Sequence, residues 1–267
     1  MLFDTHTHIN DESIKDDERE ALIKEIEASD LSYVLDAGAN IPNSIVALEH
    51  ASLYDWCYSS VGIHPEYVEE IKESDMDKIR EIARAPKCVA IGEIGLDYHY
   101  TKDNMALQHY WFRRQLDIAL ELKMPLIIHS READKDTMDI LLSSGVFAKE
   151  RKASFKDNSP HIVIHCFSGS KEFAKEYVKL GCFIGVDGPI TFKNNRRGIE
   201  VVETVPINNL VIETDAPYLT PEPFRGKRNK APYVEYIARK IAEVKGLSYE
   251  DVAKATLENG KRLYNIK

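Results

Sequence analysis

The stretch FDTHTHIN, residues 3–10, begins as an apolar strand and ends in two histidines that are one residue apart. In a β-strand, residues i and i+2 point to the same side, so His6 and His8 share one face while Thr7 points to the other. Two imidazoles on one face of a strand can ligate a metal ion together. An isolated H-x-H is also an ordinary polar strand end, and the rest of the chain decides between these two interpretations.

Seven further apolar runs follow, each short and rich in Val, Ile and Leu, as expected of strands that are buried on both faces. These runs are YVLDAG (33–38), CYSSVGIH (57–64), CVAIGEIG (88–95), PLIIHS (125–130), HIVIHCF (161–167), CFIGVDG (182–188) and NLVIETD (209–215). Together with the first run they predict eight strands.

Amphipathic helical stretches lie between the strands. One helix is predicted over 104–123 and another over 234–245, where Gly246 offers a C-cap. The last helix is predicted to begin at Ser248, a suitable N-cap. Eight strands that alternate with helices predict a (β/α)8 TIM barrel, with a doubly wound open sheet as the alternative.

The chain of 267 residues is 43% hydrophobic, which suits one large core. Barrels of this kind commonly reach this length as one domain, so a single domain is predicted over residues 1–267. The most linker-like stretch, KERKASFKDNSP (149–160), is interpreted as a surface loop.

The formal net charge is −9, which does not indicate a general nucleic-acid-binding surface. An anionic substrate would therefore need a local basic patch or metal ions. The four cysteines include no C-x-x-C pair, and no apolar run is long enough for a transmembrane helix. We expect reduced thiols, a cytoplasmic location and no membrane partner; the oligomeric state is left open, with a monomer as the simpler expectation.

Catalytic residues of a TIM barrel lie at the C-terminal ends of its strands, and the apolar runs here stop at polar side chains at that position. The residues in question are His6, His8, His64, Glu93, His129, His165 and Asp215. Any one alone would be an ordinary polar strand end. Their joint placement favours a metal centre in the barrel mouth.

A ligand set of imidazoles and carboxylates suits Zn, Mn, Co, Fe or Ni better than an all-oxygen Mg or Ca cage. Six ligands, namely His6, His8, Glu93, His129, His165 and Asp215, can hold two metal ions. Glu93 is the candidate bridge between them. Asp215 could both bind metal and accept a proton from a metal-activated water.

A series of motifs runs in order from residue 3 to residue 264: FDTHTH, GIHPE, IGEIGLDYH, PLIIHSR, IHCFSG, GPITFKNN, ETDAPYLTPEPFRGKRN and TLENGKRLY. This series resembles the TatD family of metal-dependent deoxyribonucleases, which belongs to the amidohydrolase-like barrels. The resemblance implies metal-dependent cleavage of DNA, commonly in the 3′-to-5′ direction. It also implies that the six residues above are metal ligands and that His64 and Arg131 contact the scissile phosphate region.

Two positions depart from the pattern that the resemblance implies. Pro232 comes one position late in RGKRNKAPYV, which leaves the path of the loop after Asn229 open. Asp187 stands where a small or hydroxyl residue is common, and we assign it no role.

The loop FRGKRNK (224–230) places Arg225, Lys227 and Arg228 just beyond Asp215. A charge run is usually a solvated face, but beside metal ligands it is interpreted as a grip on a phosphate backbone. The stretch FKNNRR (192–197) could extend the same basic rim on an acidic body.

Other residues are expected to have supporting roles. Glu213 is in phase with Asp215 and could orient a ligand. His161 is expected to be a buried, hydrogen-bonded residue, His50 to lie on a helix surface, and Cys166 to pack away from the mouth.

The leading functional hypothesis is a metal-dependent hydrolase of DNA phosphodiesters, a 3′-to-5′ exonuclease on single-stranded or frayed ends. Its cofactors would be two divalent ions, Mg or Mn in activity and Zn or Ni in a crystal. Tyr98 and Tyr100 could stack on an unpaired base or simply pack within their loop.

Four alternatives remain open. They are a small-molecule amidohydrolase or lactonase, an aminoacyl-tRNA deacylase, a phosphoesterase of the polymerase-and-histidinol-phosphatase type, and a binding protein without activity. The third lacks its usual terminal D-x-H, because Asp215 is followed by Ala216 and Pro217. The fourth would need degraded ligands, and all six are present.

Overall fold

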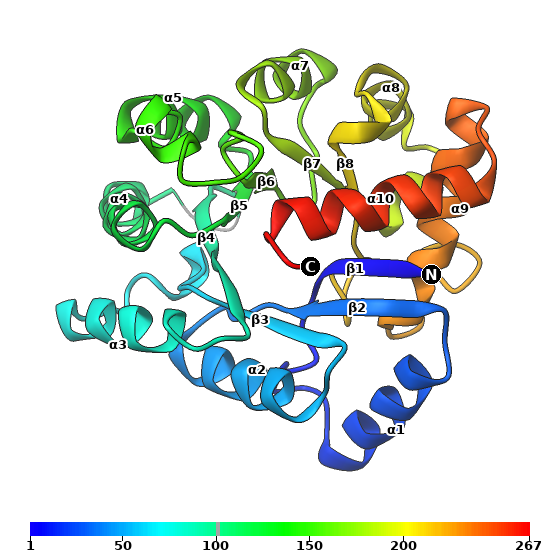
Figure 1. Cartoon of the computed structure of the whole chain (residues 1–267), viewed down its shortest axis with the longest axis horizontal. Helices are drawn as coiled ribbons and strands as arrows, with labels where there is room; N and C mark the ends of the chain where they lie inside the picture. The colour runs from blue at the N-terminus through cyan, green and yellow to red at the C-terminus, as the bar shows by residue number, and fades with distance from the viewer. Residues whose placement is uncertain (100–101) are drawn as a thin grey trace.

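The computed structural model describes residues 1–99 and 102–267. Eight parallel strands form one sheet in sequence order (Figure 1). The strands are β1 (Leu2–Thr7), β2 (Leu31–Asp36), β3 (Cys57–Val61), β4 (Cys88–Asp97), β5 (Leu126–Arg131), β6 (Ile162–Ile164), β7 (Phe183–Val186) and β8 (Leu210–Ile212). Each coincides with one of the apolar runs, so the prediction of eight strands is confirmed.

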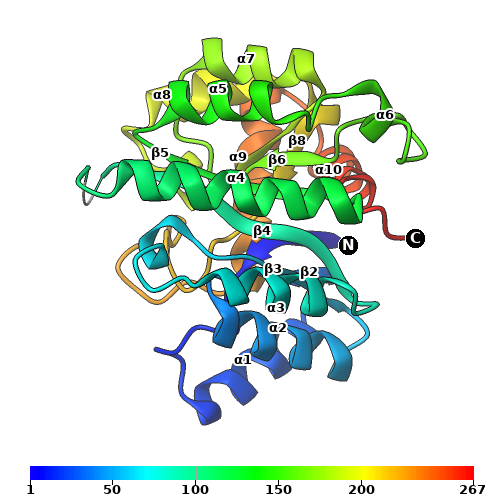
Figure 2. The same cartoon turned by 90° about the vertical axis from the view of Figure 1, so that its left-hand side faces the viewer.

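Helices surround the strands in sequence order, which gives the (β/α)8 barrel and excludes the doubly wound alternative (Figure 1). Seen from the side, α4 lies across the outside of the strands (Figure 2). The helices are α1 (Asp16–Glu27), α2 (Ile41–Leu53), α3 (Glu73–Ala83), α4 (Met105–Leu122), α5 (Asp134–Ser144), α6 (Lys149–Lys152), α7 (Lys171–Leu180), α8 (Arg196–Thr204), α9 (Val234–Lys245) and α10 (Tyr249–Leu263). No described helix is long and apolar enough to cross a membrane.

The predicted helix ends are confirmed where the sequence offered a physical signal. Gly246 ends α9 in the left-handed conformation, with φ of 63°. The Ser248 hydroxyl accepts a hydrogen bond from the backbone N–H of Asp251 and so caps α10.

The stretch 149–160 is more ordered than the predicted surface loop. It contains α6, and Arg151 within it is buried. The Arg151 guanidinium donates to the carbonyl of Val146 at 3.1 Å and to that of Met124 at 2.8 Å. A buried cation that satisfies several backbone carbonyls fixes this segment to the barrel.

The first and last strands meet through side chains. The Thr5 hydroxyl donates to the Ile212 carbonyl at 3.0 Å, and the buried Asp4 carboxylate accepts from the Thr214 backbone N–H at 2.8 Å. The Asp215 N–H donates to the His6 carbonyl at 3.0 Å. These bonds close the ring and place Asp215 beside the histidines of β1.

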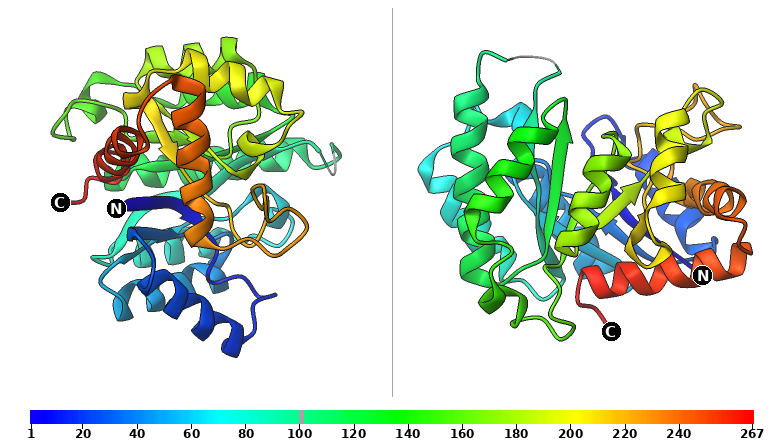
Figure 3. Two further views of the ribbon diagram at one scale, coloured as in Figure 1. Left: turned by 90° about the vertical axis from the view of Figure 1, so that its right-hand side faces the viewer. Right: turned by 90° about the horizontal axis from the view of Figure 1, so that it is seen from above.

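Helix α10 covers one end of the barrel. In Figure 1 it crosses the centre of the ring, and in Figure 3 it lies at the end opposite the loops that follow the strands. Its Leu257 and Leu263, with the following Tyr264, join a buried cluster with inward-facing side chains from seven strands, namely Phe3, Leu35, Ala90, Ile127, Val163, Phe183 and Val211. The C-terminal ends of the strands are left as the open end.

Candidate metal centre

A cavity of about 710 Å³ occupies the open end of the barrel, and residues at the ends of all eight strands contribute to its lining. This is the position at which TIM barrels place their catalytic residues. The predicted ligands that line it are His8, Glu93, His129, His165 and Asp215. His6 lies beneath them and is fully buried.

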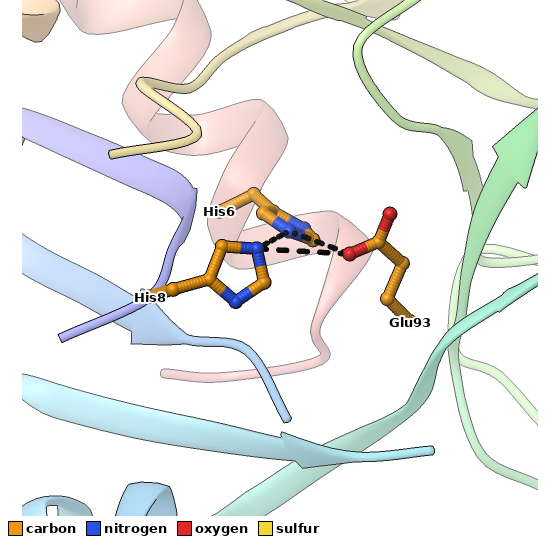
Figure 4. A group of neighbouring side chains, drawn as sticks. All are labelled: His6, His8 and Glu93. Atoms are coloured by element: carbon orange, nitrogen blue, oxygen red, sulfur yellow. Dashed lines mark hydrogen bonds and ion pairs between the residues drawn. The ribbon is translucent and has the colours of Figure 1, made fainter. Parts of the chain in front are cut away.

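His6 and His8 point together into the barrel, as the two-residue period of β1 predicts. Their Nε2 atoms are 3.1 Å apart. Both face the same carboxylate oxygen, Oε2 of Glu93, at 3.3 Å from His6 and 3.7 Å from His8 (Figure 4). Three electron-pair donors that converge on one point in a buried site are a suitable set for a cation.

The other carboxylate oxygen of Glu93 faces a second group of imidazoles. Oε1 lies 2.7 Å from His129 Nδ1, 3.4 Å from His165 Nε2 and 3.6 Å from His64 Nε2. Glu93 therefore has one oxygen toward each group of histidines, which is the arrangement expected of a bridging carboxylate.

Asp215 approaches from the end of β8. Its Oδ1 lies 3.4 Å from His8 Nε2, 3.8 Å from His6 Nε2 and 3.9 Å from His165 Nε2. The rings of His6 and His165 stack with their centroids 3.8 Å apart. Asp215 therefore lies where it can share a cation with the histidines of β1 and β6.

Among the described residues, three groups have donor atoms close enough to hold a metal ion, within 4.8 Å of one another. They are His6–His8–Glu93, His6–His165–Asp215 and His64–Glu93–His129. The structure thus brings all six predicted ligands together. His64, which the sequence assigned to substrate binding, lies within the third group.

Two carboxylates support these donors from behind. Asp97 Oδ2 lies 3.0 Å from His129 Nε2, and Glu213 Oε1 lies 3.1 Å from His165 Nδ1. Such partners orient metal-binding imidazoles. The position of Glu213 agrees with the sequence prediction, but Asp97 was missed, although it ends the same strand as Glu93 and on the same face.

The electrostatics of the site follow from burial and close packing of opposite charges. Burial alone would lower the pKa of His8, but the carboxylates of Asp215 and Glu93 raise it to about 9. Burial also opposes ionisation of Glu93, yet His165, whose own pKa is raised to about 10, holds the pKa of the Glu93 carboxyl well below the usual range. Burial and the neighbouring His129 lower the pKa of His64 to about 3, so the His64 imidazole stays neutral at physiological pH.

The predicted substrate-binding residues fall into two sets. His64 and Arg131 line the cavity, and Arg197 lines it as well. The predicted Arg225, Lys227 and Arg228 of the loop 224–230 do not. Arg228 instead pairs with Glu18 at 2.7 Å, and Arg225 lies over the Phe192 ring at 4.3 Å.

The lining of the cavity is rich in carboxylates. These are Asp11, Glu66, Glu93, Asp97, Asp187 and Asp215, whereas Arg131 and Arg197 are its arginines. Binding of an anion here therefore requires cations that offset the carboxylates, which agrees with a metal-loaded site.

Cys166 and His50 differ from their predicted environments. Cys166 lines the cavity, and its Sγ lies 2.7 Å from Oδ2 of Asp187, so it does not pack away from the mouth. His50 is buried, with Nδ1 2.7 Å from Asp36 Oδ2. The predicted surface position of His50 is therefore wrong, because α2 packs this residue against Asp36 at the end of β2.

Two other expectations concern His161 and Tyr98. His161 is buried and hydrogen-bonded as predicted, with Nδ1 2.9 Å from the Leu263 carbonyl oxygen. Tyr98 is buried, and its hydroxyl donates to Asp136 at 2.8 Å, which favours packing over base stacking. Tyr100 lies outside the described residues.

Comparison with known proteins extends this picture. A family model described as TatD related DNase matches residues 3–265. An uncharacterized metal-dependent hydrolase, YabD of Bacillus subtilis (strain 168), is 41% identical over 266 residues, which cover 100% of both chains. A protein of Erwinia tasmaniensis named 3′-5′ ssDNA/RNA exonuclease TatD is 32% identical, over 99% of this chain and 100% of its own.

A solved structure shows the same fold. The crystal structure of YJJV, a TATD homolog from Escherichia coli K12, matches with a TM-score of 0.87 at 27% identity, over 100% of this chain and 98% of the other. The likeness extends over the whole barrel.

Proposed function

The chain belongs to the TatD family of metal-dependent hydrolases, and from this premise we propose that it removes nucleotides from the 3′ end of single-stranded or frayed DNA. One observation carries the proposal: Glu93 directs its two oxygens to two groups of histidines at the floor of a cavity that also holds arginines. The Erwinia relative, whose name includes both single-stranded DNA and RNA, supports a nucleic-acid substrate.

We propose that His6, His8, Glu93, His129, His165 and Asp215 hold two divalent cations. When bound, these cations supply Lewis-acid polarisation of a phosphate and a nucleophile at neutral pH. Glu93 would bridge them, since its oxygens face both groups of imidazoles. Mg or Mn would serve in activity, whereas Zn or Ni would suit the imidazole-rich set in a crystal.

Asp215 is the carboxylate best placed to accept a proton from the attacking water. Its side chain is 14% exposed to the cavity, against 4% for Glu93. A general base must reach both the water and the solvent that finally takes the proton. Glu93 is too enclosed for that role and is better suited to holding the cations.

Arg131 and His64 would bind the phosphate. Both line the cavity, and the Arg131 guanidinium offers a planar pair of donors that matches a phosphate. The neutral His64 imidazole can donate one hydrogen bond without adding charge to the crowded floor.

The shape of the cavity favours a strand end. A volume of about 710 Å³ is typical of small-ligand sites, and α10 closes the opposite end of the barrel. A single nucleotide with its flanking phosphate can enter such a cavity, whereas an intact duplex cannot. We further propose that residues 1–267 act as one domain and as a monomer, and that the protein is cytoplasmic, where its four free thiols would stay reduced.

The test is digestion of 5′- and 3′-labelled single-stranded oligonucleotides by metal-stripped protein, with Mg, Mn or Zn added back singly. A ladder that shortens from the 3′ end, restored by metal and absent in Asp215→Ala, is the expected result. Shortening from the 5′ end would refute the proposed direction. Equal activity in Asp215→Ala would identify a contaminating nuclease.

A second candidate function is hydrolysis of a small ester, lactone or amide, or of an aminoacyl-tRNA ester. The observation that favours it is the lining itself, which holds six carboxylates and none of the basic residues of the loop 224–230. Turnover of such esters with no cleavage of any oligonucleotide would establish this alternative.

A further inference from the structure

A second, smaller hollow adjoins the cavity of the metal centre. It has a volume of about 420 Å³ and is lined by residues 189 and 192–195 with Glu222 and Arg225. Pro189 and Asn195 line both spaces, so the hollow begins where the main cavity ends. We call it the side groove; it lies between the segments that follow β7 and β8.

The side groove is basic in a chain that is acidic as a whole. Lys193 and Arg225 are exposed along it, and Glu222 is its single carboxylate. Arg197, which is also exposed, lines the main cavity, where its guanidinium donates to the Ser168 carbonyl at 3.5 Å. A strand that leaves the metal centre through the side groove therefore meets one cationic side chain in the main cavity and two along the groove.

The walls of the side groove are held in place from both sides. The Asn195 amide donates to the Pro189 carbonyl at 2.9 Å, and the Glu222 backbone N–H donates to the Thr191 hydroxyl at 2.8 Å. The Arg225 guanidinium rests over the Phe192 ring. A groove formed before binding loses less entropy when a ligand is bound.

The main cavity beside the side groove has the reverse charge, because six carboxylates and two arginines line it. Asp11 follows β1 and Glu66 follows β3, and both line the cavity. The Asp11 carboxylate accepts a hydrogen bond from the Tyr218 hydroxyl at 2.7 Å. A chain of phosphates would be repelled on this side and attracted toward Arg197 and the side groove.

We propose that the side groove binds the strand that continues beyond the scissile bond of a single-stranded polynucleotide. The terminal nucleotide occupies the main cavity, the next phosphates pass Arg197, and those after them contact Lys193 and Arg225. The flat face of the Arg225 guanidinium is available for stacking with a base. This assignment rests on the proposed nuclease function and adds a binding path for the substrate.

The assignment also explains the arrangement of the loop 224–230. Arg225 faces the side groove, whereas Arg228 is turned toward Glu18 and the Ser13 carbonyl on the opposite side. The basic loop thus contributes one of its arginines to the strand path and uses the other to hold the segment before α1.

The experiment compares a dinucleotide with a twelve-residue oligonucleotide, (dT)2 and (dT)12. Protein loaded with Mn²⁺ is titrated with 5′-fluorescein-labelled strands whose phosphodiesters are replaced by cleavage-resistant phosphorothioates, and anisotropy reports binding without turnover. The same loaded protein is then assayed for cleavage of both lengths as unmodified strands. The variant is Lys193→Ala/Arg225→Ala, and the matched control is Arg239→Ala/Lys240→Ala, which removes the same charge from α9.

The expected result is that the groove variant binds (dT)12 about tenfold more weakly and cleaves (dT)2 as the wild type does. The dependence of log K on log salt should flatten by about 1.4, because two phosphate contacts to a single strand are lost. The control variant should match the wild type in every measurement.

Other outcomes separate this inference from the proposed function. If the wild type cleaves oligonucleotides and the groove variant binds (dT)12 as tightly as the control does, the side groove is not the strand path, and the nuclease function stands. If no oligonucleotide is bound or cleaved by the wild type, the nuclease function fails and the strand path fails with it. If the groove variant lost cleavage of (dT)2 as strongly as it lost binding of (dT)12, the substitutions would have disturbed the metal centre. That result would refute a separate binding path.

Discussion

The two ends of this barrel are built from the same strands but from opposite kinds of side chain. Phe3 of β1 packs under α10 at the closed end, while His6 and His8 of the same segment converge on Glu93 at the open end. At the closed end apolar side chains fill the space, and at the open end buried polar groups face one another. The comparison shows that the same strands contribute to stability at the closed end and to chemistry at the open end.

The open end is expected to cost stability when no cation is bound. Its imidazoles and carboxylates are buried close together, and burial of charge is unfavourable unless each group is compensated. The closed end has the opposite balance, because apolar burial stabilises the fold. Substitutions at the two ends should therefore separate activity from stability.

The largest expected effect is on activity at the open end. Glu93→Gln keeps the shape of the side chain but removes the charge that faces both groups of histidines. Loss of about 4 kcal/mol of transition-state stabilisation corresponds to roughly a thousandfold lower rate. Initial rates on a labelled oligonucleotide check this, with the melting temperature measured in parallel.

The control for that substitution is Glu49→Gln, an exposed position on α2. It should leave both rate and melting temperature unchanged. If Glu93→Gln lowered the melting temperature as much as a substitution at the closed end does, this result would contradict the division between the two ends.

Metal addition should give the next largest effect. A cation that binds only the folded protein stabilises it by about 2.7 kcal/mol at a hundred times its dissociation constant. Thermal melting of stripped protein with and without Mn or Zn measures this gain. Glu93→Gln should abolish most of this rise in melting temperature, whereas closed-end variants should keep it. If metal raised the melting temperature of Glu93→Gln as much as that of the wild type, Glu93 would not be a ligand.

Gly260→Ala should disturb the closed end alone. A Cβ at this position of α10 would lie 2.6 Å from Cδ1 of Phe3 and 2.9 Å from Cγ2 of Thr5. Alanine favours a helix over glycine by about 1 kcal/mol, but the overpacking should prevail and destabilise the fold by about 1–3 kcal/mol. Urea unfolding measures the change, and the specific activity of the folded protein should be retained.

Lys254→Ala, on the exposed side of the same helix, is the matched control. Its free energy of unfolding should stay within about 0.5 kcal/mol of the wild type. If Gly260→Ala were as stable as this control, α10 would not seal the barrel as tightly as the distances indicate.

The smallest expected effect is a change in pH dependence at the closed end. Burial lowers the pKa of His161, although Asp157 opposes the shift. The unfolded chain therefore takes up a proton on this residue more readily than the folded chain, and the stability that His161 contributes is lost as pH falls below about 6.5. His161→Gln should show a flatter profile of unfolding free energy between about pH 8 and 5, and an unchanged profile would refute the assignment.

Much of the open end could be predicted from residue order. The strand period placed His6 and His8 on one face, and the rule that barrel chemistry lies at strand ends brought Glu93, His129, His165 and Asp215 into one site. Asp97 could also have been found, because it shares a face of β4 with Glu93. Asp97 was missed because the apolar run predicts a strand that ends at Gly95, whereas β4 extends to Asp97.

Other features could not be predicted in the same way. The position of Arg228 beside Glu18 and of Arg225 beside Phe192 depends on how two loops approach each other. His64 joined a group of possible ligands because β3 and β5 bring it close to Glu93 and His129. These contacts join segments that lie far apart in the chain.

By itself, the sequence determined the eight strands, the helices between them and the polar residue that ends most of the strands. Those features depend on the local period of apolar residues and on capping signals, which are set by near neighbours in the chain. Only the tertiary structure decided that α10 seals one end, that the two oxygens of Glu93 divide between two groups of histidines, and that the side groove is basic while carboxylates line the main cavity. The physical reason is that these features depend on the register and curvature of the closed sheet, which bring distant loops within a few ångströms of one another.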